Sequence, residues 1–348
     1  MTDVQAPANA MDSQCERCAL LASEAADPVL TNRQWALYPI KHPELFALAK
    51  QAVACFWTVD ELDFSTDTGD FRKLSVEDRQ ALLVALSFFA QADGIVMENV
   101  SANYMHKVAL PEAHYFYAMQ MAMEAIHSEV YALMLDLYVS QEVDRARVLQ
   151  VVTEMPSVQA KNAWAKKWIG AEAPVGVLLL ASCCVEGIFF SSSFALIFFF
   201  RMRGLLPGLS MANDFIARDE GLHVRFAAAL LATLRQKPSQ ALAVQMLREA
   251  AEVEKRFVAE MLPSGGLAGG FPLDSAMQHC EAMTDVVSRM CGYGPIFDAA
   301  TPFDFMRMQE IEGKANFFEK RPSEYRKAAA CCSPPVSAQD AFALVENF

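Results

Sequence analysis

The side chains in this sequence that could hold a metal ion begin with the segment Met123–Tyr131. It is expected to form one helix, in which Glu124 and His127 are three residues apart and Tyr131 follows one turn later. Because a helix has 3.6 residues per turn, these three side chains project from one face. A carboxylate and an imidazole at this spacing can bind one cation, and Tyr131 would lie ~6 Å further along the axis. That separation is short enough for the tyrosine to exchange an electron with a metal ion.

The rest of a ligand set occurs on later and earlier segments. Glu220 and His223 repeat the Glu-x-x-His pair, and Glu186 is isolated within a long apolar run. Asp93 is the candidate from the remaining helix. Two such pairs plus two isolated carboxylates on four helices form the ligand pattern of ferritin-like di-metal proteins. The sequence therefore predicts a buried di-metal site within a helical bundle.

Each of these residues also has an ordinary structural interpretation. A glutamate is usually a solvated surface charge, and Tyr131 alone would be a core tyrosine with a hydrogen-bonded hydroxyl. Asp93 alone would be an aspartate beside a glycine bend. The metal interpretation is favoured because both pairs and Glu186 occur together. Helical phase does not decide whether Glu98 and Glu129 face the site.

Composition limits the class of protein and its partners. The chain has 348 residues, 53% hydrophobic and 20% charged, which is enough for one large core or two modest ones. Its net charge of −13, without a Lys/Arg cluster, argues against a nucleic-acid partner. No sustained apolar segment of a secretory signal occurs in the first thirty residues. Nine cysteines without a regular framework favour reduced thiols, so a cytoplasmic location is expected.

One apolar run is long enough to cross a membrane. Between Pro174 and Phe200 the only charged side chain is Glu186. A carboxylate near the middle of a span is costly in lipid, and four serines add further polar atoms. A helix that is apolar on every side is also expected at the centre of a large bundle. We therefore predict a soluble protein without a membrane partner, in which this run is the central buried helix.

Periodicity and turn residues predict an all-α chain without a phosphate-binding glycine loop or a fixed repeat. We expect an irregular segment over 31–43, with Ser75 capping a helix that extends to about 107. The other helices are expected over 44–56, 111–140, 142–154, 157–169, 174–200, from 209 through 223, 238–262 and 273–291. We predict flexible tails over 1–30 and 320–348 around a ferritin-like domain over 31–319.

Five motifs resemble those of a known family. They are Phe56-Trp-Thr-x-x-Glu-Leu-Asp63, Phe88-Phe-Ala-x-x-Asp-Gly-Ile-Val96, Ala122-Met-Glu-x-Ile-His-Ser-Glu129, Val185-Glu-Gly-Ile-Phe-Phe190 and Arg218-Asp-Glu-Gly-Leu-His223. In this order they resemble the small subunit of class I ribonucleotide reductase, of the eukaryotic and large-DNA-virus type. The resemblance covers the chain from about Arg33 to Tyr325.

The resemblance implies two iron ions per chain, held by Asp93, Glu124, His127, Glu186, Glu220 and His223. Oxidation by dioxygen would then take one electron from Tyr131 and leave a stable tyrosyl radical. The family's apolar pocket around that tyrosine is matched by Phe190, Phe194 and Ile216, which would be core residues in any case. Such a pocket excludes water and reductants that would quench the radical.

The resemblance also implies a homodimer and a large catalytic subunit as partner. The family passes its radical to a cysteine of that subunit, where ribonucleotides are reduced to deoxyribonucleotides. The residues that match this relay are His127, Asp219, Trp57 and Tyr325. Asp219 would hydrogen-bond the remaining nitrogen of the ligand imidazole, although alone it would be a solvated or capping carboxylate, and Trp57 a packed aromatic. The carboxyl-terminal tail resembles the family's docking peptide, with Phe342, Leu344 and Phe348 as apolar anchors.

Other functions remain open on the sequence. A di-iron oxygenase or desaturase would not need Tyr131 or the tail with Tyr325. A ferritin-like store would take up far more than two irons per chain, and a catalytically silent subunit would bind iron without forming a radical. A manganese–iron centre is a further alternative, although that branch typically lacks an oxidisable tyrosine here. No role follows for the four cysteines outside the helical domain, Cys15, Cys18, Cys331 and Cys332.

Overall fold

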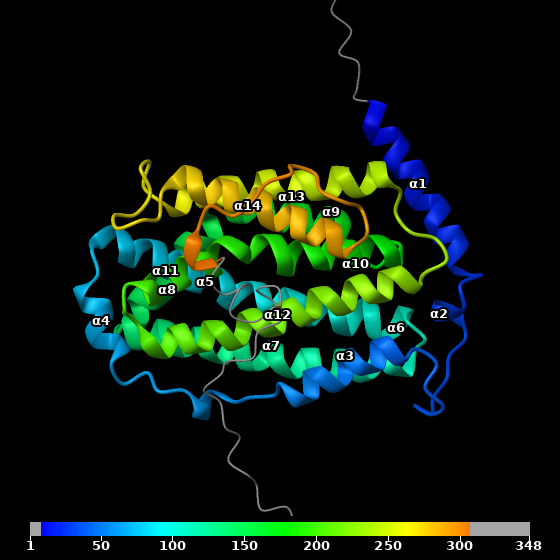
Figure 1. Cartoon of the computed structure of the whole chain (residues 1–348), viewed down its shortest axis with the longest axis horizontal. Coiled ribbons are helices and arrows are strands. Elements are labelled where there is room, and N and C mark those ends of the chain that lie inside the picture. The colour runs from blue at the N-terminus through cyan, green and yellow to red at the C-terminus, as the bar shows by residue number, and fades with distance from the viewer. Residues whose placement is uncertain (1–7, 307–348) are drawn as a thin grey trace, which may run out of the picture.

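The computed structural model of the chain describes residues 8–306. Predictions that concern Tyr325, the tail over 320–348 with its three apolar anchors, and Cys331 and Cys332 lie outside the described residues. Within them the chain is built from helices that run side by side in a bundle (Figure 1). The predicted all-α, ferritin-like class is confirmed.

The longer helices follow the predicted order, whereas the helices over 8–24, 28–31 and 67–73 and the π-helical segment over 100–104 were not predicted. The elements are α1 Ala8–Glu24, α2 Pro28–Thr31, α3 Pro43–Ala54, the 3₁₀ turn η1 Val59–Glu61, α4 Asp67–Lys73, α5 Val76–Asn99, the π-helical segment η2 Val100–Tyr104, α6 Met105–Lys107, α7 Pro111–Tyr138, α8 Glu142–Glu154, α9 Pro156–Trp168, α10 Val175–Cys184, the π-helical segment η3 Val185–Phe189, α11 Ser191–Met202, α12 Pro207–Thr233, α13 Gln240–Met261 and α14 Leu273–Met290.

Side-chain caps fix the starts of two helices that carry predicted ligands. Ser75 Oγ accepts a hydrogen bond from the Asp78 backbone N–H at 3.0 Å, which is the predicted cap of α5. Buried Asp67 accepts from the N–H groups of Gly208 and Leu209 at 3.0 and 2.7 Å and so caps α12. These first N–H groups have no partner within their own helix, so the caps set where each helix begins.

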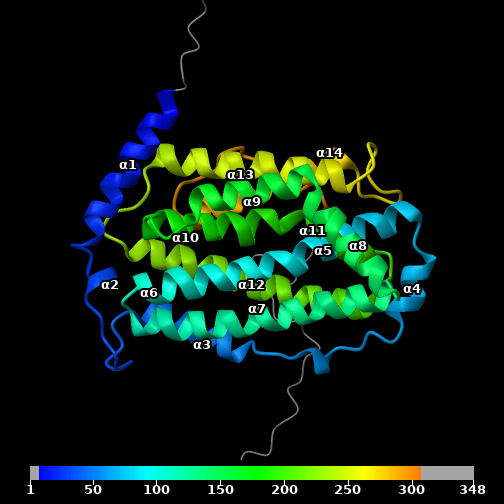
Figure 2. The same cartoon turned by 180° about the vertical axis from the view of Figure 1, so that it is seen from behind.

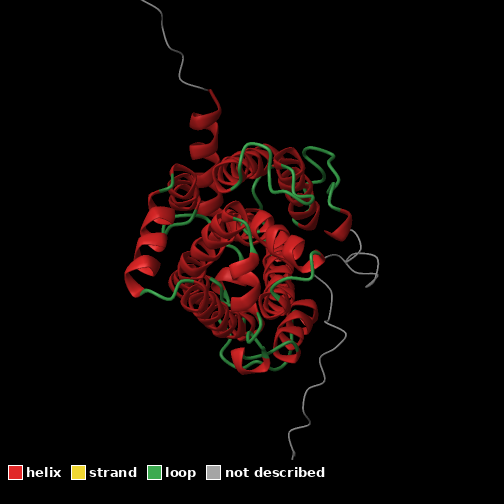
Figure 3. Ribbon diagram, turned by 90° about the vertical axis from the view of Figure 1, so that its left-hand side faces the viewer, coloured by secondary structure: helices red, strands yellow, loops and turns green. Residues whose placement is uncertain are grey.

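The predicted central helix is α10, η3 and α11 in succession. Every residue from 175 to 200 is buried. In Figure 2, α10 and α11 lie between α9 and α13 on one side and α5, α12 and α7 on the other. Figure 3 looks along the bundle and shows its helices packed against one another. The interruption of the central helix by η3 was not predicted.

Two stretches are long and apolar enough to cross a membrane, Val76–Lys107 and Val175–Met202. In the second, 94% of the most apolar window is buried inside the protein, and in the first 56% is buried. Core helices of a soluble bundle have this same composition. Burial against other helices therefore accounts for both stretches.

A flexible tail is predicted over residues 1–30, of which residues 1–7 lie outside the described residues; the rest forms ordered structure. Residues 8–24 form α1, whose first end projects from the bundle in Figure 1. Its second half is docked, because Leu20 is buried and the Glu24 carboxylate accepts a hydrogen bond from the N–H of Val175 at the start of α10. The prediction relied on the scarcity of large apolar side chains. Buried Leu20, the Glu24 carboxylate and the Glu16 carboxylate, which accepts hydrogen bonds from Ser239, are among the contacts that instead hold α1 in place.

Candidate metal centre

The structure brings the six predicted ligands together at the centre of the bundle. Asp93 comes from α5, Glu124 and His127 from α7, Glu186 from η3, and Glu220 and His223 from α12. Each of these side chains is buried, with at most 3% of its surface exposed. Four elements that are far apart in sequence therefore place carboxylates and imidazoles in one water-excluded volume.

The potential ligand atoms form two groups that share Glu124. One group contains Asp93, Glu124 and His127, and the other contains Glu124, Glu186, Glu220 and His223. Within each group the ligand atoms lie within 4.8 Å of one another. The arrangement therefore offers two adjacent cation sites with one imidazole each.

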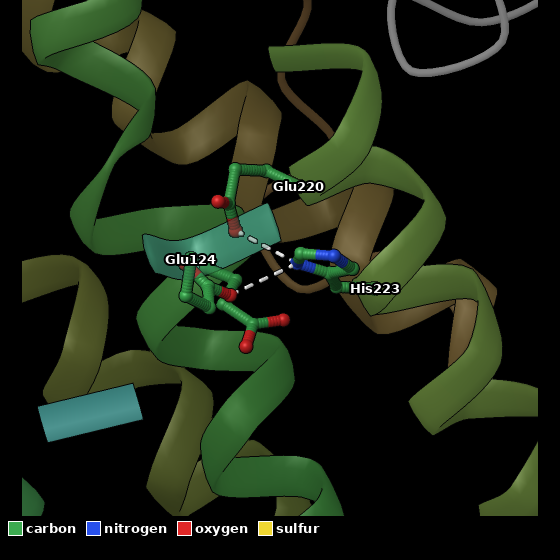
Figure 4. A group of neighbouring side chains, drawn as sticks. Glu124, Glu220 and His223 are labelled. Carbon is green, nitrogen blue, oxygen red and sulfur yellow. Dashed lines mark ion pairs between the residues drawn. The ribbon is translucent and has the colours of Figure 1, made fainter. Parts of the chain in front are cut away.

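Two carboxylates connect the two imidazoles. Glu124 places Oε2 3.5 Å from His127 Nδ1 and Oε1 3.2 Å from His223 Nδ1. Glu220 places Oε1 3.1 Å from His127 Nδ1 and Oε2 3.4 Å from His223 Nδ1. Figure 4 shows Glu124 and Glu220 converging on His223. A carboxylate that turns one oxygen toward each imidazole is placed to bridge two metal ions.

The donor set fits two divalent cations. Several of its buried atoms make no well-oriented hydrogen bond among the described residues, although imidazole and carboxylate atoms lie 3.1 to 3.5 Å apart: Asp93 Oδ2, Glu124 Oε2, His127 Nδ1, Glu220 Oε1 and Oε2, and His223 Nδ1. Buried polar atoms without partners are strongly unfavourable. Cations bound between these atoms would satisfy them, and carboxylate oxygens with imidazole nitrogens suit iron and manganese.

Burial and mutual charge shift the pKa values of the cluster. Burial and the neighbouring Glu124 carboxylate raise the pKa of Asp93 well above its usual range, and burial does the same for Glu186. Burial alone would lower the pKa values of His127 and His223, but the carboxylates around them raise both well above 6.5. Without metal the cluster therefore retains protons, which cation binding must displace. We therefore expect metal affinity to rise with pH.

Glu186 is positioned by two features that the sequence analysis missed. Gln120 Nε2 donates to Glu186 Oε1 at 2.9 Å and lies 3.5 Å from Glu124 Oε1. Its position one turn before Glu124 on the same helix face was the available signal. The second feature is η3 itself, which carries Glu186, since π-helical turns are frequent at functional sites. No residue pattern in the sequence predicted that the helix would become π-helical at η3.

A glycine beside Glu186 allows η3 to pack closely against α14. A Cβ atom on Gly187 would lie 2.4 Å from Val287 Cγ2 and 3.4 Å from Val224 Cγ2. We expect Gly187→Ala to lower the free energy of unfolding by about 1–3 kcal/mol, as overpacking of a core does, measured by urea denaturation of metal-free protein.

Gly94 is the matched control, because it also follows a predicted ligand directly. A Cβ atom there would meet nothing within 4 Å, and the helix position is exposed. Gly94→Ala should leave stability unchanged or raise it by up to about 1 kcal/mol through helix propensity. Equal losses in the two variants would contradict the packing argument.

Tyr131 lies in an apolar environment on α7. Its ring stacks on Phe89, with centroids 4.7 Å apart and planes at 8°, and its hydroxyl has no hydrogen-bond partner among the described residues. Phe89 in turn contacts Phe190 and Phe194 at centroid distances of 5.2 and 4.9 Å, and Ile216 is buried on α12. Burial raises the pKa of Tyr131 well above 10. The phenol is therefore neutral and shielded, and Phe89 is the contact that the sequence analysis did not single out.

A chain of direct contacts leads from the cluster to Trp57. His127 Nε2 lies 3.3 Å from Asp219 Oδ2, which also accepts a hydrogen bond from Trp57 Nε1 at 2.7 Å. The Trp57 and His127 rings are stacked with centroids 6.1 Å apart. Arg218, also unanticipated, donates to Asp219 Oδ1 at 3.0 and 3.2 Å. Burial acts to raise the pKa of Asp219, but His127 and Arg218 lower it overall, so this carboxylate is ionised.

The two carboxylates whose orientation was left open lie outside the cluster. Glu98 and Glu129 are both exposed. Their neighbours Val96 and Val130 are buried, so each glutamate occupies the solvent face of its helix. These two residues do not contribute ligands.

A cavity of about 80 Å³ leads toward the cluster between α5 and α9. Its lining includes Glu186 and Ser182 on the central helix, and Ile95, which is 42% exposed. Most of the other lining side chains are apolar. The cavity therefore lies on the Glu186 side of the cluster, between Glu186 and the partly exposed Ile95.

Comparison with known proteins places the whole bundle in one family. The model of the ribonucleotide reductase small chain matches residues 34–302. The ribonucleoside-diphosphate reductase small chain of Nicotiana tabacum is 39% identical, over 92% of this chain and 98% of the relative. The human subunit M2 is 38% identical, over 91% of this chain and 80% of the relative.

Solved structures agree with these matches. The ribonucleotide reductase Rnr4 homodimer of Saccharomyces cerevisiae has a TM-score of 0.77 at 29% identity, covering 87% of this chain and 97% of that one. The dimanganese(II)-NrdF of Streptococcus sanguinis shares the fold, with a TM-score of 0.69 at 15% identity over 77% and 94% of the two chains. With a matching model over most of its length and relatives near 39% identity, the chain belongs to the ribonucleotide reductase small-chain family.

Proposed function

We propose that this chain, the small subunit of a class I ribonucleoside-diphosphate reductase, stores an oxidising equivalent as a radical on Tyr131. The observation that carries the proposal is the position of Tyr131, one helical turn after His127 and stacked on Phe89 in a dry environment. The stored equivalent would serve the reduction of ribonucleotides to deoxyribonucleotides on the large catalytic subunit.

The six side chains of the cluster would hold two iron ions, which supply one-electron oxidation of the phenol with dioxygen as oxidant. The protein itself determines the environment of the Tyr131 phenol. Loss of one electron and the phenolic proton from Tyr131, both taken up in the reduction of dioxygen toward water, would give a neutral radical, which an apolar environment tolerates better than a phenolate. Phe89, Phe190 and Phe194 keep water and reductants away from it. Both iron and manganese suit this donor set, so the choice of iron rests on the family resemblance.

Electron paramagnetic resonance tests this function. The full chain is loaded with ferrous iron without oxygen, dioxygen is admitted, and the spectrum and the iron content are measured. We expect two irons per chain and the doublet of an organic radical. Iron uptake far above two would indicate a metal store instead. Two irons without a radical would indicate a silent subunit or a different di-iron oxidase.

We further propose that the radical leaves through His127, Asp219 and Trp57 toward Tyr325. The direct contacts among the first three support the route. We expect Trp57→Phe to leave the Tyr131 radical in place, because an aromatic ring still fills the site and Asp219 still accepts hydrogen bonds from Arg218. Turnover with the large subunit should fall by about 100-fold or more, roughly 2.7 kcal/mol.

Trp164→Phe is the control for this relay, because Trp164 is buried in the same bundle on α9, which bears none of the predicted ligands. It should retain both the radical and turnover. Turnover of Trp57→Phe at the wild-type rate would exclude Trp57 from the route. The measurement pairs the radical signal with steady-state reduction of a ribonucleoside diphosphate.

We also propose that the chain forms a homodimer in the cytoplasm and docks on the large subunit through Phe342, Leu344 and Phe348. The yeast relative is described as a homodimer, and short peptides with apolar anchors bind as they become ordered. Sedimentation of the full chain would give the oligomeric state. A synthetic peptide of the last residues should compete with the full chain for the large subunit.

A further inference from the structure

A buried ion pair outside the metal centre joins three elements of the bundle. Lys161 on α9 is 2% exposed, Glu254 on α13 is fully buried, and Nζ lies 2.7 Å from Glu254 Oε2. The same ammonium donates to the carbonyl oxygen of Phe189 at 2.9 Å. It also lies over the rings of Phe88 and Phe257, at 3.7 and 3.6 Å from their centroids. One charged group thus contacts α13, α5 and the last residue of η3.

Packing of α9 against α13 does not by itself explain this pair. Removing two charges from water is so unfavourable that apolar residues of similar size commonly serve as well or better. Burial lowers the pKa of Lys161 to about 8 despite Glu254, and burial raises the pKa of Glu254 despite Lys161. Both shifts reflect incomplete compensation for lost hydration. The contact with Phe189 is the feature that an apolar pair could not reproduce.

That contact falls on the segment that carries Glu186. Phe189 ends η3, and Glu186 is the second residue of the same five-residue segment. A π-helical turn closes over one more residue than an α-helical turn, so backbone groups at its boundary need other partners. Lys161 Nζ supplies a donor there. Lys161, Phe189 and Glu186 also line the same cavity, so the three are close in space.

Loss of the donor would free η3 to return to α-helical register. Such a change rotates a residue about the helix axis by about 100°, the angular step of one residue in an α-helix. Glu186 would then leave the group formed with Glu220 and His223, while Asp93 and His127, on α5 and α7, would stay in place. The expected consequence is confined to one of the two cation sites.

We propose that the Lys161–Glu254 pair positions Glu186 by holding η3 through the Phe189 carbonyl. The pair would so set the affinity of the cation site that contains Glu186, Glu220 and His223, called here the second cation site. Lys161 is a positioning residue, since its ammonium contacts the backbone of η3 rather than a metal ligand. Glu254 keeps the ammonium charged and directed. The inference rests on the proposed metal centre and adds a determinant of its second site.

The test uses the full chain with Lys161→Met and Glu254→Met combined. Replacing both charges avoids an unpaired buried charge, and methionine packs well against Phe88 and Phe257. Metal-free protein is titrated with cobalt(II) without oxygen, and calorimetry and visible absorption follow two binding steps. We expect the first step to match wild type and the second to weaken by about 10- to 100-fold, as loss of outer-shell partners does.

Lys167→Met with Glu249→Met is the matched control. This pair joins the same two helices at the same 2.7 Å, but its side chains are 47% and 32% exposed. It should leave both steps unchanged. Urea denaturation confirms that each variant is folded and shows whether its midpoint has moved.

Three results would overturn the proposal. One is wild-type binding of both cations in the folded Lys161/Glu254 variant. Another is an equal loss of affinity in both binding steps together with a lower midpoint of urea denaturation, which would indicate a general structural role. The third is the same weakening in the control. Failure of the proposed metal centre would be seen separately, because wild-type protein would then not bind two cobalt ions.

Discussion

Replacing Tyr131 with phenylalanine should abolish the organic radical and leave iron binding and the fold intact. The change removes only the hydroxyl, which lacks a hydrogen-bond partner among the described residues, and keeps the ring that stacks on Phe89. Removing a buried hydroxyl of this kind is neutral or stabilising. Reduction of ribonucleotides with the large subunit should fall by about a thousandfold or more, roughly 4 kcal/mol of activation free energy.

Tyr138→Phe provides the control on the same helix. Tyr138 is also largely buried and stacked, with its ring centroid 4.4 Å from that of Phe71, but its hydroxyl donates to Asp67 at 3.3 Å. This variant should keep the radical and lose some stability, because Asp67 caps α12. The radical is measured by electron paramagnetic resonance and the iron content by a colorimetric assay. A persistent doublet in Tyr131→Phe would move the radical to another residue.

Replacing Glu124 with glutamine should remove both metal ions rather than one. Glu124 belongs to both ligand groups and turns one oxygen toward each imidazole. Burial acts to raise its pKa, but His127 and His223 lower the pKa to about 2, so it is a carboxylate at neutral pH. Glutamine keeps the volume and removes the charge that both cations share. We expect affinity to fall by more than about 100-fold, beyond the usual effect of an outer-shell partner.

Metal content and thermal stability measure this effect together. Ligands that bind only the folded state stabilise it, by about 2.7 kcal/mol at a hundredfold excess over Kd. Added metal should therefore raise the melting temperature of wild type and not that of Glu124→Gln. Glu129→Gln, on the exposed face of the same helix, should behave as wild type. Retention of one tightly bound ion in Glu124→Gln would contradict the bridging assignment.

The buried cluster of candidate ligands could be predicted because its signals are local. Residues three apart on a helix share a face whatever surrounds the helix, so Glu124 with His127 and Glu220 with His223 could be paired from spacing alone. Glu186 was identifiable because a lone carboxylate in an apolar run needs partners. Helix boundaries followed equally local rules, such as the Ser75 cap and the proline that begins α7.

The misses have a different physical origin. Phe89, Gln120 and Arg218 look like ordinary helix residues, and their roles arise from neighbours on other elements. The docking of residues 8–30 uses contacts with distant parts of the chain, such as Glu24 with the start of α10 and Asp27 with the backbone of Arg235, more than a hundred residues away in sequence. Composition over a window contains no information about such contacts.

By itself, the sequence determined the all-α class, the four segments that carry the candidate ligands and the residues that point to a di-metal centre, because periodicity and spacing act within one helix. Only the tertiary structure decided which oxygens of Glu124 and Glu220 face which imidazole, how η3 presents Glu186, and which buried ammonium donates to the last carbonyl of η3. Those properties depend on the packing of separate helices, where interaxial position and side-chain contacts are set by the whole core rather than by any single segment.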